Sequence, residues 1–85
     1  MYFVYILESL KDHNFYTGCT SDLTKRLKAH NSGKVRSTQK RRPFKLVYQE
    51  EAATLSYARR RENELKSLKG GAAKRELVNN FNARP

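Results

Sequence analysis

The sequence predicts a small α+β fold with its elements in the order β-β-α-β-α-α. Two short strand-like segments flank a polar turn near the N-terminus, and a third lies in mid-chain. Segments with apolar residues at helical spacing separate and follow them. Because a short turn joins the first two strands, we expect them to pair antiparallel, with helices packed on the sheet.

The first two strands form the predicted hairpin. Residues 2–7 (YFVYIL) are rich in aromatic and β-branched side chains, and residues 15–19 (FYTGC) follow with a similar strand-like character. Asp and Asn in residues 11–14 supply turn residues between them. Tyr5 and Tyr16 are therefore expected side by side in one small sheet, which raises the question of what two neighbouring phenols do there.

The first helix is predicted over residues 22–31 (DLTKRLKAHN). Ser21 or Asp22 can cap its N-terminus, Leu23 and Leu27 lie at helical spacing, and Asn31 and Gly33 are expected to end it. Residues 32–43 are polar and basic and are predicted to be a loop.

The remaining elements are one strand and two helices. Residues 44–50 (FKLVYQE) have strand character, Thr54 can cap a helix that runs to about Lys69, and Gly70 and Gly71 are expected to break it. A final helix carries its apolar residues on one side, namely Ala73, Leu77 and Phe81.

Length and composition limit the possibilities. A chain of 85 residues is long enough for one modest core, so residues 1–85 are expected to form one domain, and we expect a monomer. Glu8 and Lys11 interrupt the apolar N-terminus before it could serve as a membrane span or a signal sequence, so a soluble, cytoplasmic protein is expected, with no membrane partner. The single cysteine, Cys19, argues against a disulfide and against a structural zinc site.

The charge indicates a polyanionic partner. The chain has 18 Lys and Arg against 8 Asp and Glu, a formal net charge of +10. No acidic residue lies between Asp22 and Glu50, and that segment carries Lys25, Arg26, Lys28, Lys34, Arg36, Lys40, Arg41, Arg42 and Lys45. Such a segment favours nucleic acid, because phosphate contacts release counterions. A ribosome-associated protein and a merely well-solvated surface are the alternatives.

Two polar residues of the first helix lie beside its apolar stripe. Leu23, Arg26 and His30 are spaced by three and then four residues, which places them on one side of the helix. Arg26 and His30 should therefore border the buried surface. The alternative for each is structural: an arginine whose stem covers apolar surface, and a half-buried, hydrogen-bonded histidine.

The second helix offers a carboxylate. Glu62 lies nearly in line with Leu55 and Ala58 and three residues before Leu65, so it should point inward, whereas Glu64 should point away. The alternative is an intrahelical ion pair with Lys66 or Arg59, an interpretation that suits Glu64 better than Glu62.

These residues together suggest phosphodiester cleavage. That reaction needs a base for the attacking water, positive charge for the phosphorane and help for the leaving 3′ oxygen. A divalent ion on one carboxylate can serve the last two needs, and Mg²⁺ suits a single carboxylate because it keeps several waters. A tyrosine becomes a base only where positive charge favours phenolate, and Arg26 with the basic segment could supply it.

In these features the chain resembles the GIY-YIG nucleases, and in particular their small stand-alone bacterial branch. The first half-motif is Phe3-Val4-Tyr5 and the second is Tyr16-Thr17-Gly18, and the similarity extends through residues 22–33, 41–50 and 58–66. The resemblance implies a three-stranded antiparallel sheet flanked by helices and metal-dependent phosphodiester hydrolysis.

The resemblance also implies roles for particular residues. It makes Tyr5, Tyr16, Arg26, His30 and Glu62 the catalytic set, with Glu62 as the metal ligand. We expect one phenol to act as base or water orienter and the other as a positioning donor, and which is which stays open. Gly18 is expected to let a phosphate approach the backbone closely.

Three positions depart from the family pattern. Phe3 stands in place of the leading glycine and Thr17 in place of the central isoleucine, and neither change moves the tyrosines out of phase. Cys19 stands where several branches have a lysine, so the lysine's role is absent or falls to another group such as His30. Cys19 itself is expected to be a small packing residue.

The sequence therefore predicts a DNA endonuclease that uses one Mg²⁺ or Mn²⁺ ion. The alternative is a nucleic-acid-binding module that kept the fold without useful catalysis, and RNA stays open as a substrate. The residues expected to contact nucleic acid are Gly18, Lys25, Lys34, Arg36, Lys40, Arg41 and Arg42.

Overall fold

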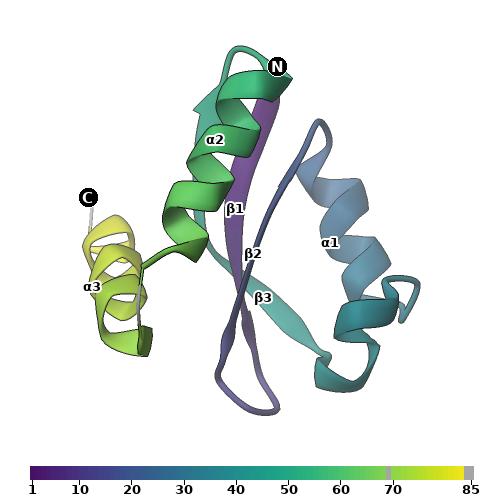
Figure 1. Cartoon of the computed structure of the whole chain (residues 1–85). Helices are drawn as coiled ribbons and strands as arrows, with labels where there is room; N and C mark the ends of the chain where they lie inside the picture. Colours follow the sequence, from purple (N-terminus) through teal and green to yellow (C-terminus); the bar gives the residue numbers. More distant parts are fainter. Residues whose placement is uncertain (69, 84–85) are drawn as a thin grey trace.

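The computed structural model describes residues 1–68 and 70–83 and has the predicted elements in the predicted order (Figure 1). They are β1 (Tyr2–Ser9), β2 (Phe15–Thr20), α1 (Leu23–Asn31), a 3₁₀ helix η1 (Arg36–Arg41), β3 (Phe44–Ala52), α2 (Leu55–Lys66) and α3 (Gly70–Asn82).

The strands form one antiparallel sheet of three strands in the order β2-β1-β3. This confirms the predicted hairpin and the predicted sheet. The β1–β3 register shifts between Ile6 and Leu7, where the pairing is irregular. Strand β2 is an edge strand, and Tyr16 near its start is only half-buried, which matters for the site described below.

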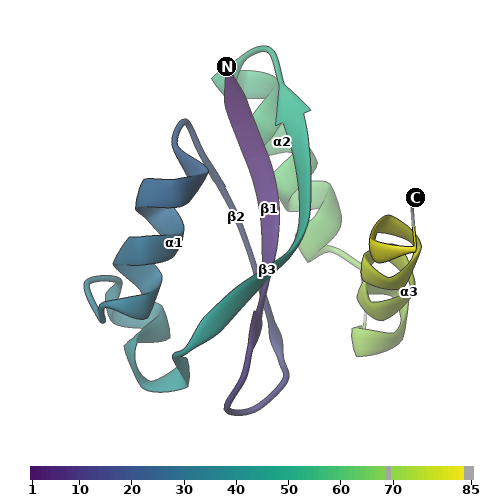
Figure 2. The ribbon, with the colours of Figure 1, turned by 180° about the vertical axis from the view of Figure 1, so that it is seen from behind.

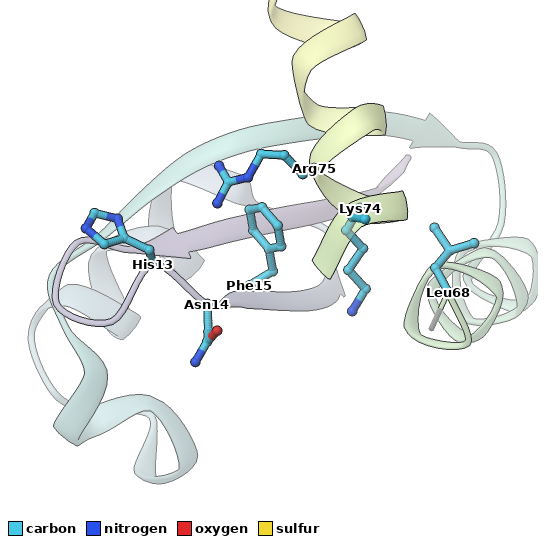
Figure 3. A pocket seen from close by; sticks show the side chains of 7 residues that line it. His13, Asn14, Phe15, Leu68, Lys74 and Arg75 are labelled. Atoms are coloured by element: carbon cyan, nitrogen blue, oxygen red, sulfur yellow. The ribbon is translucent and has the colours of Figure 1, made fainter. Parts of the chain in front are cut away.

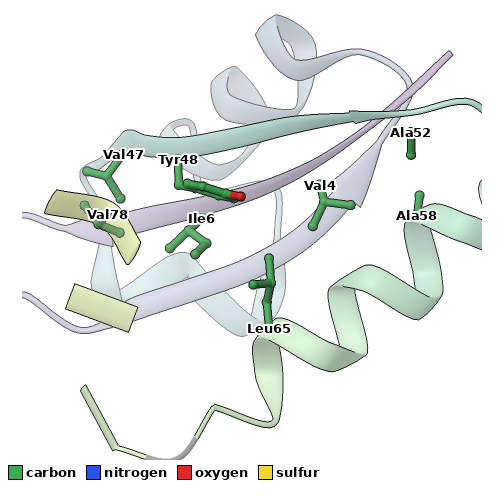
Figure 4. Packing of buried hydrophobic residues seen from close by; sticks show 8 residues of the cluster. All are labelled: Val4, Ile6, Val47, Tyr48, Ala52, Ala58, Leu65 and Val78. Atoms are coloured by element: carbon green, nitrogen blue, oxygen red, sulfur yellow. The ribbon is translucent and has the colours of Figure 1, made fainter. Parts of the chain in front are cut away.

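Alternate side chains of β1 serve opposite faces of the sheet. Val4 and Ile6 join an apolar cluster under α2 and α3 (Figure 4), together with Val47, Tyr48, Ala52, Ala58, Leu65 and Val78. Tyr5 and Leu7 pack on the other face with Leu23 and Leu27 of α1 and with Phe44. Two opposite views show α1 on one side of the sheet and α2 with α3 on the other (Figures 1 and 2).

The helix boundaries follow local capping chemistry. Asp22, one of the two predicted candidates, caps α1 by accepting a hydrogen bond from the Lys25 amide at 3.0 Å. Thr54 caps α2 through the Tyr57 amide at 3.1 Å, as predicted. At the end of α1 the Asn31 side chain accepts from the Phe44 amide at 2.6 Å, which ties the helix to the start of β3.

Each strand runs one or two residues beyond its predicted end, and the helices differ from the prediction in three ways. The segment predicted as a loop contains η1, in which Thr38 is fully buried. Helix α2 ends at Lys66, where the Ser67 hydroxyl donates to the Glu64 carbonyl, and Lys69 lies outside the described residues. Helix α3 begins at Gly70, so the two glycines open this helix and do not precede it. Glycine weakens a helix mainly through backbone entropy in its interior, so it costs less at the helix end.

No helix in the described part of the chain is long and apolar enough to cross a bilayer.

Candidate active site

Tyr5, in the middle of β1, lies at the centre of the candidate site. It pairs with Gly18 of β2, and a Cβ built on Gly18 would lie only 2.6 Å from the Tyr5 hydroxyl oxygen. Any side chain at position 18 would therefore displace the phenol. Gly18 is buried, and its open side is filled by Tyr5, which differs from the predicted phosphate contact.

A chain of hydrogen bonds leads inward from the Tyr5 hydroxyl. Its oxygen lies 3.2 Å from His30 Nε2, and His30 Nδ1 lies 2.8 Å from Thr38 Oγ1. The Thr38 hydroxyl donates to the Val35 carbonyl at 3.3 Å, so Thr38 Oγ1 accepts from His30 Nδ1–H. His30 Nε2 is then the acceptor for the Tyr5 hydroxyl proton.

His30 lies deeper than its sequence position suggests. Its exposed fraction is 0%, and its ring packs edge-on against Tyr16 with centroids 4.9 Å apart. Burial, and secondly the charge of Arg26, lower its pKa from 6.5 to about 4, so the imidazole is neutral at pH 7. The prediction placed His30 at the border of the buried stripe. In the structure it lies behind the two tyrosines and can act on a substrate only through them.

Arg26 connects the two phenols. Its Nε donates to the Tyr5 hydroxyl at 3.4 Å. The hydrogen bond to Tyr5, and to a smaller extent the nearby Tyr16 phenol, raise the pKa of Arg26 further above its already high value, so the group stays charged. Arg26 is half-buried, and a guanidinium has five N–H donors, so donors remain for a phosphate.

The two tyrosines are neighbours, as predicted, but they are not equivalent. Their ring centroids lie 6.5 Å apart. Tyr5 is 1% exposed, whereas Tyr16 on the edge strand is half-buried. Burial raises the pKa of Tyr5 despite the hydrogen bond and charge of Arg26, so the expected phenolate is not favoured at this position. Tyr16 is therefore the phenol that a substrate can reach.

Glu62 approaches the site from α2. Its side chain is 17% exposed against 56% for Glu64, in agreement with the predicted directions of the two residues. Glu62 Oε2 lies 2.6 Å from Lys66 Nζ. The prediction that an intrahelical pair suits Glu64 better than Glu62 was wrong, because Glu62 makes the close pair with Lys66, whereas Glu64 lies 3.8 Å from Arg61.

Cys19 links Glu62 to the edge strand. Burial, and secondly a hydrogen bond to Glu62, raise the pKa of the Cys19 thiol, which keeps it protonated. Cys19 also packs against the apolar cluster, consistent with a packing role. Burial is the main reason for the raised pKa of Tyr5, but the charge of Glu62 contributes, so carboxylate and phenol lie within electrostatic reach.

The basic residues surround this centre unevenly. Lys25, Lys34, Arg36, Lys40 and Arg42 are exposed. Lys40 and Arg42 line a pocket of about 480 Å³ with Lys11 and Gln39. Arg41 differs, because its Nε pairs with Asp12 at 3.1 Å and its guanidinium lies over the Phe44 ring. Asp12 thus partly neutralises the charge of Arg41 within the protein.

Three residues of this region were not predicted from the sequence. Thr38 lies in a segment that was expected to be an irregular loop, and only η1 brings it to His30. Lys11 was assigned to the hairpin turn, although the turn brings its side chain against η1. Lys66 lies four residues after Glu62, and this spacing is the signal that could have identified it as the partner of that carboxylate.

Comparison with known proteins gives one family. Residues 1–76 match the sequence profile of the GIY-YIG catalytic domain. The chain is 45% identical over 68 residues to the UPF0213 protein SH2523 of Staphylococcus haemolyticus, covering 79% of this chain and 82% of that protein. It is 44% identical over 78 residues to a UPF0213 protein of Syntrophus aciditrophicus, covering 89% and 87%.

A solved structure is also similar. The solution NMR structure of the UPF0213 protein BH0048 from Bacillus halodurans superposes with a TM-score of 0.58 at 42% identity, covering 93% of this chain and 84% of that one. The match of the profile over most of the chain shows that this protein belongs to the GIY-YIG family, which implies nuclease activity on nucleic acid.

Proposed function

We propose that the chain, acting as one domain and as a monomer, is a divalent-metal-dependent endonuclease that hydrolyses phosphodiester bonds in DNA. The observation that carries this proposal is that Arg26 donates to the Tyr5 hydroxyl and interacts electrostatically with Tyr16 beside the edge strand, with Glu62 in electrostatic reach. Cation, hydroxyl and carboxylate are the groups that attack on a phosphodiester requires.

Tyr16 and Arg26 are the residues that contact the substrate in this proposal. Both are half-buried, so they can reach a phosphate, whereas Tyr5 and His30 cannot. Tyr5 and His30 are positioning residues: they hold Arg26 and the Tyr16 ring from beneath. Thr38 in turn holds the imidazole in the tautomer that accepts from Tyr5.

The reaction is a displacement at phosphorus. The Tyr16 hydroxyl accepts a hydrogen bond from the attacking water and directs its oxygen at the phosphorus. As the new P–O bond forms, the bond to the 3′ oxygen breaks; the water passes one proton through the Tyr16 hydroxyl to solvent, and the departing 3′ oxygen takes up a proton from solvent. The free N–H groups of Arg26 donate to the phosphoryl oxygens on which negative charge builds up.

The donor set fits one mostly hydrated divalent ion. Among residues 1–68 and 70–83 no three His, Cys, Asp or Glu side chains gather as a metal cage. A single inward carboxylate suits Mg²⁺, or Mn²⁺, which keep most of their waters. Glu62 would hold the ion, and Lys66 can leave the carboxylate because its side chain is 50% exposed and such helical pairs are worth only about 0.5 kcal/mol. The bound ion would supply positive charge beside the scissile phosphate.

The basic surface of Lys11, Lys40 and Arg42 would bind the nucleic-acid backbone. Replacing Lys40 and Arg42 by alanine should weaken binding to all sequences equally. It should also lower the slope of log affinity against log salt by roughly one unit for each phosphate that the variant no longer neutralises. Arg41→Ala should change this slope less, because Asp12 already pairs with Arg41.

The central experiment is a cleavage assay on single-stranded, duplex, nicked and branched DNA and on RNA, with Mg²⁺, with Mn²⁺ and with chelator. Glu62→Gln should abolish metal-dependent cleavage while folding and DNA affinity persist, and Glu64→Gln, its exposed neighbour on α2, should cleave normally. Normal cleavage by Glu62→Gln would overturn the metal assignment. Binding without cleavage by the unmodified protein would favour a non-catalytic binding module.

A further inference from the structure

A second pocket lies on the opposite face of the sheet from Tyr5. It has a volume of about 600 Å³ and lies between the hairpin turn and α3 (Figure 3). Its lining residues are His13, Asn14, Phe15, Leu68, Ala72, Lys74 and Arg75. None of these residues is acidic, and the volume is within the range of small-ligand sites.

The pocket contains a planar arginine side chain that two neighbours hold in place. The Arg75 guanidinium lies 4.6 Å from the centroid of the Phe15 ring, and its Nη1 donates to Glu8 Oε1 at 3.1 Å. Glu8 is only 7% exposed, and its other oxygen lies 3.2 Å from His13 Nδ1. The guanidinium plane is thus held from below by a ring and from the side by a carboxylate. Figure 3 shows Arg75 reaching from α3 across Phe15.

The remaining polar groups suit a nucleotide. Among the described residues no carboxylate pairs with Lys74, so its ammonium is available for a phosphate. Planar guanidinium and aromatic groups stack on bases without regard to sequence, and cations follow the backbone. Asn14 supplies both donor and acceptor atoms at the rim.

The position of the pocket connects it to the proposed active site. Phe15 and Tyr16 are consecutive residues of the edge strand β2, and their side chains pack on opposite faces of the sheet. We propose that this pocket binds a single-stranded nucleic-acid segment that passes around the edge of β2 from the phosphate held at Tyr16. This inference rests on the proposed nuclease function and specifies its substrate as a nucleic acid with a single-stranded arm.

The bending stiffness of nucleic acid determines whether a single strand or a duplex can follow this path around β2. Duplex DNA has a persistence length of about 150 base pairs and resists bending even over 20 to 30 base pairs. It cannot turn around one strand of a sheet within a few nucleotides. A flexible single strand can do so, and its unpaired bases are free to stack on Arg75.

The test uses the full chain with chelator present, so that cleavage plays no part. Amide shifts in ¹H–¹⁵N spectra are followed during titration with a single-stranded oligothymidylate of about 10 nucleotides, a length that one small groove covers. Separate titrations use the matching oligouridylate, a blunt duplex, thymidine monophosphate and inorganic phosphate. We expect the amides of Asn14, Phe15, Lys74 and Arg75 to shift with the single strands and not with the duplex.

Charge reversal provides the matched variant. Lys74→Glu should lower affinity for the single strand by about tenfold and leave duplex affinity at the level of the control. The control is Arg60→Glu, an equal change of charge on the exposed side of α2. Equal decreases in single-strand affinity for the two variants would overturn the proposal.

Other outcomes are equally decisive. Amide shifts confined to the α1 face during titration with the single strands would overturn the proposal. So would pocket shifts that free phosphate or the mononucleotide produces and the single strands do not. Shifts in the pocket for a protein that never cleaves would remove the proposed nuclease function but leave the single-strand site. Normal cleavage without amide shifts in the pocket would remove the single-strand site but leave the proposed nuclease function.

Discussion

The two faces of the sheet are buried to a similar degree but are built from different chemistry. On the α2 and α3 face, Val4 and Ile6 are 0% exposed and pack among apolar side chains. On the α1 face, Tyr5 is 1% exposed and His30 and Thr38 are 0% exposed, yet all three make side-chain hydrogen bonds.

The two faces differ less in how deeply their side chains are buried than in whether their buried polar groups have hydrogen-bond partners. Polar groups on the α1 face form a continuous chain from Arg26 to the Val35 carbonyl. On the other face Thr17 Oγ1 is buried without a hydrogen-bond partner among the described residues. A buried polar network with satisfied partners fixes side-chain positions, whereas an isolated buried hydroxyl only costs stability. We therefore expect changes in the hydrogen-bonded network of the α1 face to affect catalysis and changes in the apolar cluster of the other face to affect stability.

The largest expected effect is on the rate of cleavage. Tyr16→Phe should lower the single-turnover rate by about 10² to 10⁴, because the variant lacks the substrate-facing hydroxyl, with little change in melting temperature. Tyr5→Phe, the matched change one strand away, leaves His30 Nε2 without its donor. Tyr5→Phe should lower the free energy of unfolding by about 1 to 3 kcal/mol and should lower the cleavage rate less than Tyr16→Phe does.

Cleavage rates and thermal melts of both variants check this pair. If Tyr5→Phe abolishes cleavage while Tyr16→Phe cleaves within a few-fold of the parent, the assignment of the substrate-facing phenol must be reversed.

The next effect tests the apolar face. Ile6→Ala should lower the free energy of unfolding by about 2 to 5 kcal/mol, because it removes buried methyl groups and leaves a cavity. Its neighbour Tyr5 points to the other face, so the rate of the folded protein at low temperature should stay close to that of the parent. Urea titrations and cleavage assays at the same temperature measure both, and a decrease in rate as large as that of Tyr16→Phe would show that the faces are coupled.

The third effect is a dependence of stability on pH. Because the pKa of His30 falls from 6.5 to about 4 on folding, the unfolded chain binds more protons than the folded chain does between pH 4 and pH 6.5. Stability should be full above pH 6.5 and fall by about 3 kcal/mol as the pH approaches 4. Glu8 and Asp12, whose pKa values are lowered from 4.5 and 3.8, contribute at the acidic end and below.

Two measurements check this. Urea titrations from pH 7 to 4 give the stability, and the His30 ring signals in NMR spectra give its titration directly. A His30 ring that becomes charged near pH 6.5 in the folded protein would contradict the buried network.

The smallest expected effect is an increase in stability. Thr17→Val removes the unpartnered hydroxyl and keeps the side-chain shape, so it should raise the free energy of unfolding by about 1 kcal/mol without altering cleavage. Thr38→Val is the matched change on the α1 face, and it should be destabilising, because it deprives His30 Nδ1–H of its acceptor. A decrease in the stability of Thr17→Val would mean that this hydroxyl has a partner.

Much of the fold could be predicted because its signals are local. The alternation of Val4, Tyr5 and Ile6 determines which side chains share a face, and Asp22 and Thr54 cap helices through amides three residues away. The spacing of Glu62 likewise predicted that it lies more buried than Glu64. The GIY-YIG half-motifs carried the family, which the profile match confirmed.

The sequence by itself thus determined the order of elements, the hairpin that makes the two tyrosines neighbours and the inward carboxylate, since each depends on short-range patterns along the chain. Only the tertiary structure decided that Tyr5 is covered while Tyr16 is reachable, and that Thr38 meets His30. It also decided that Arg75 lies over Phe15, which is far away in the chain. Exposure and partners at these positions depend on how distant segments pack against the sheet, and no local periodicity encodes that packing.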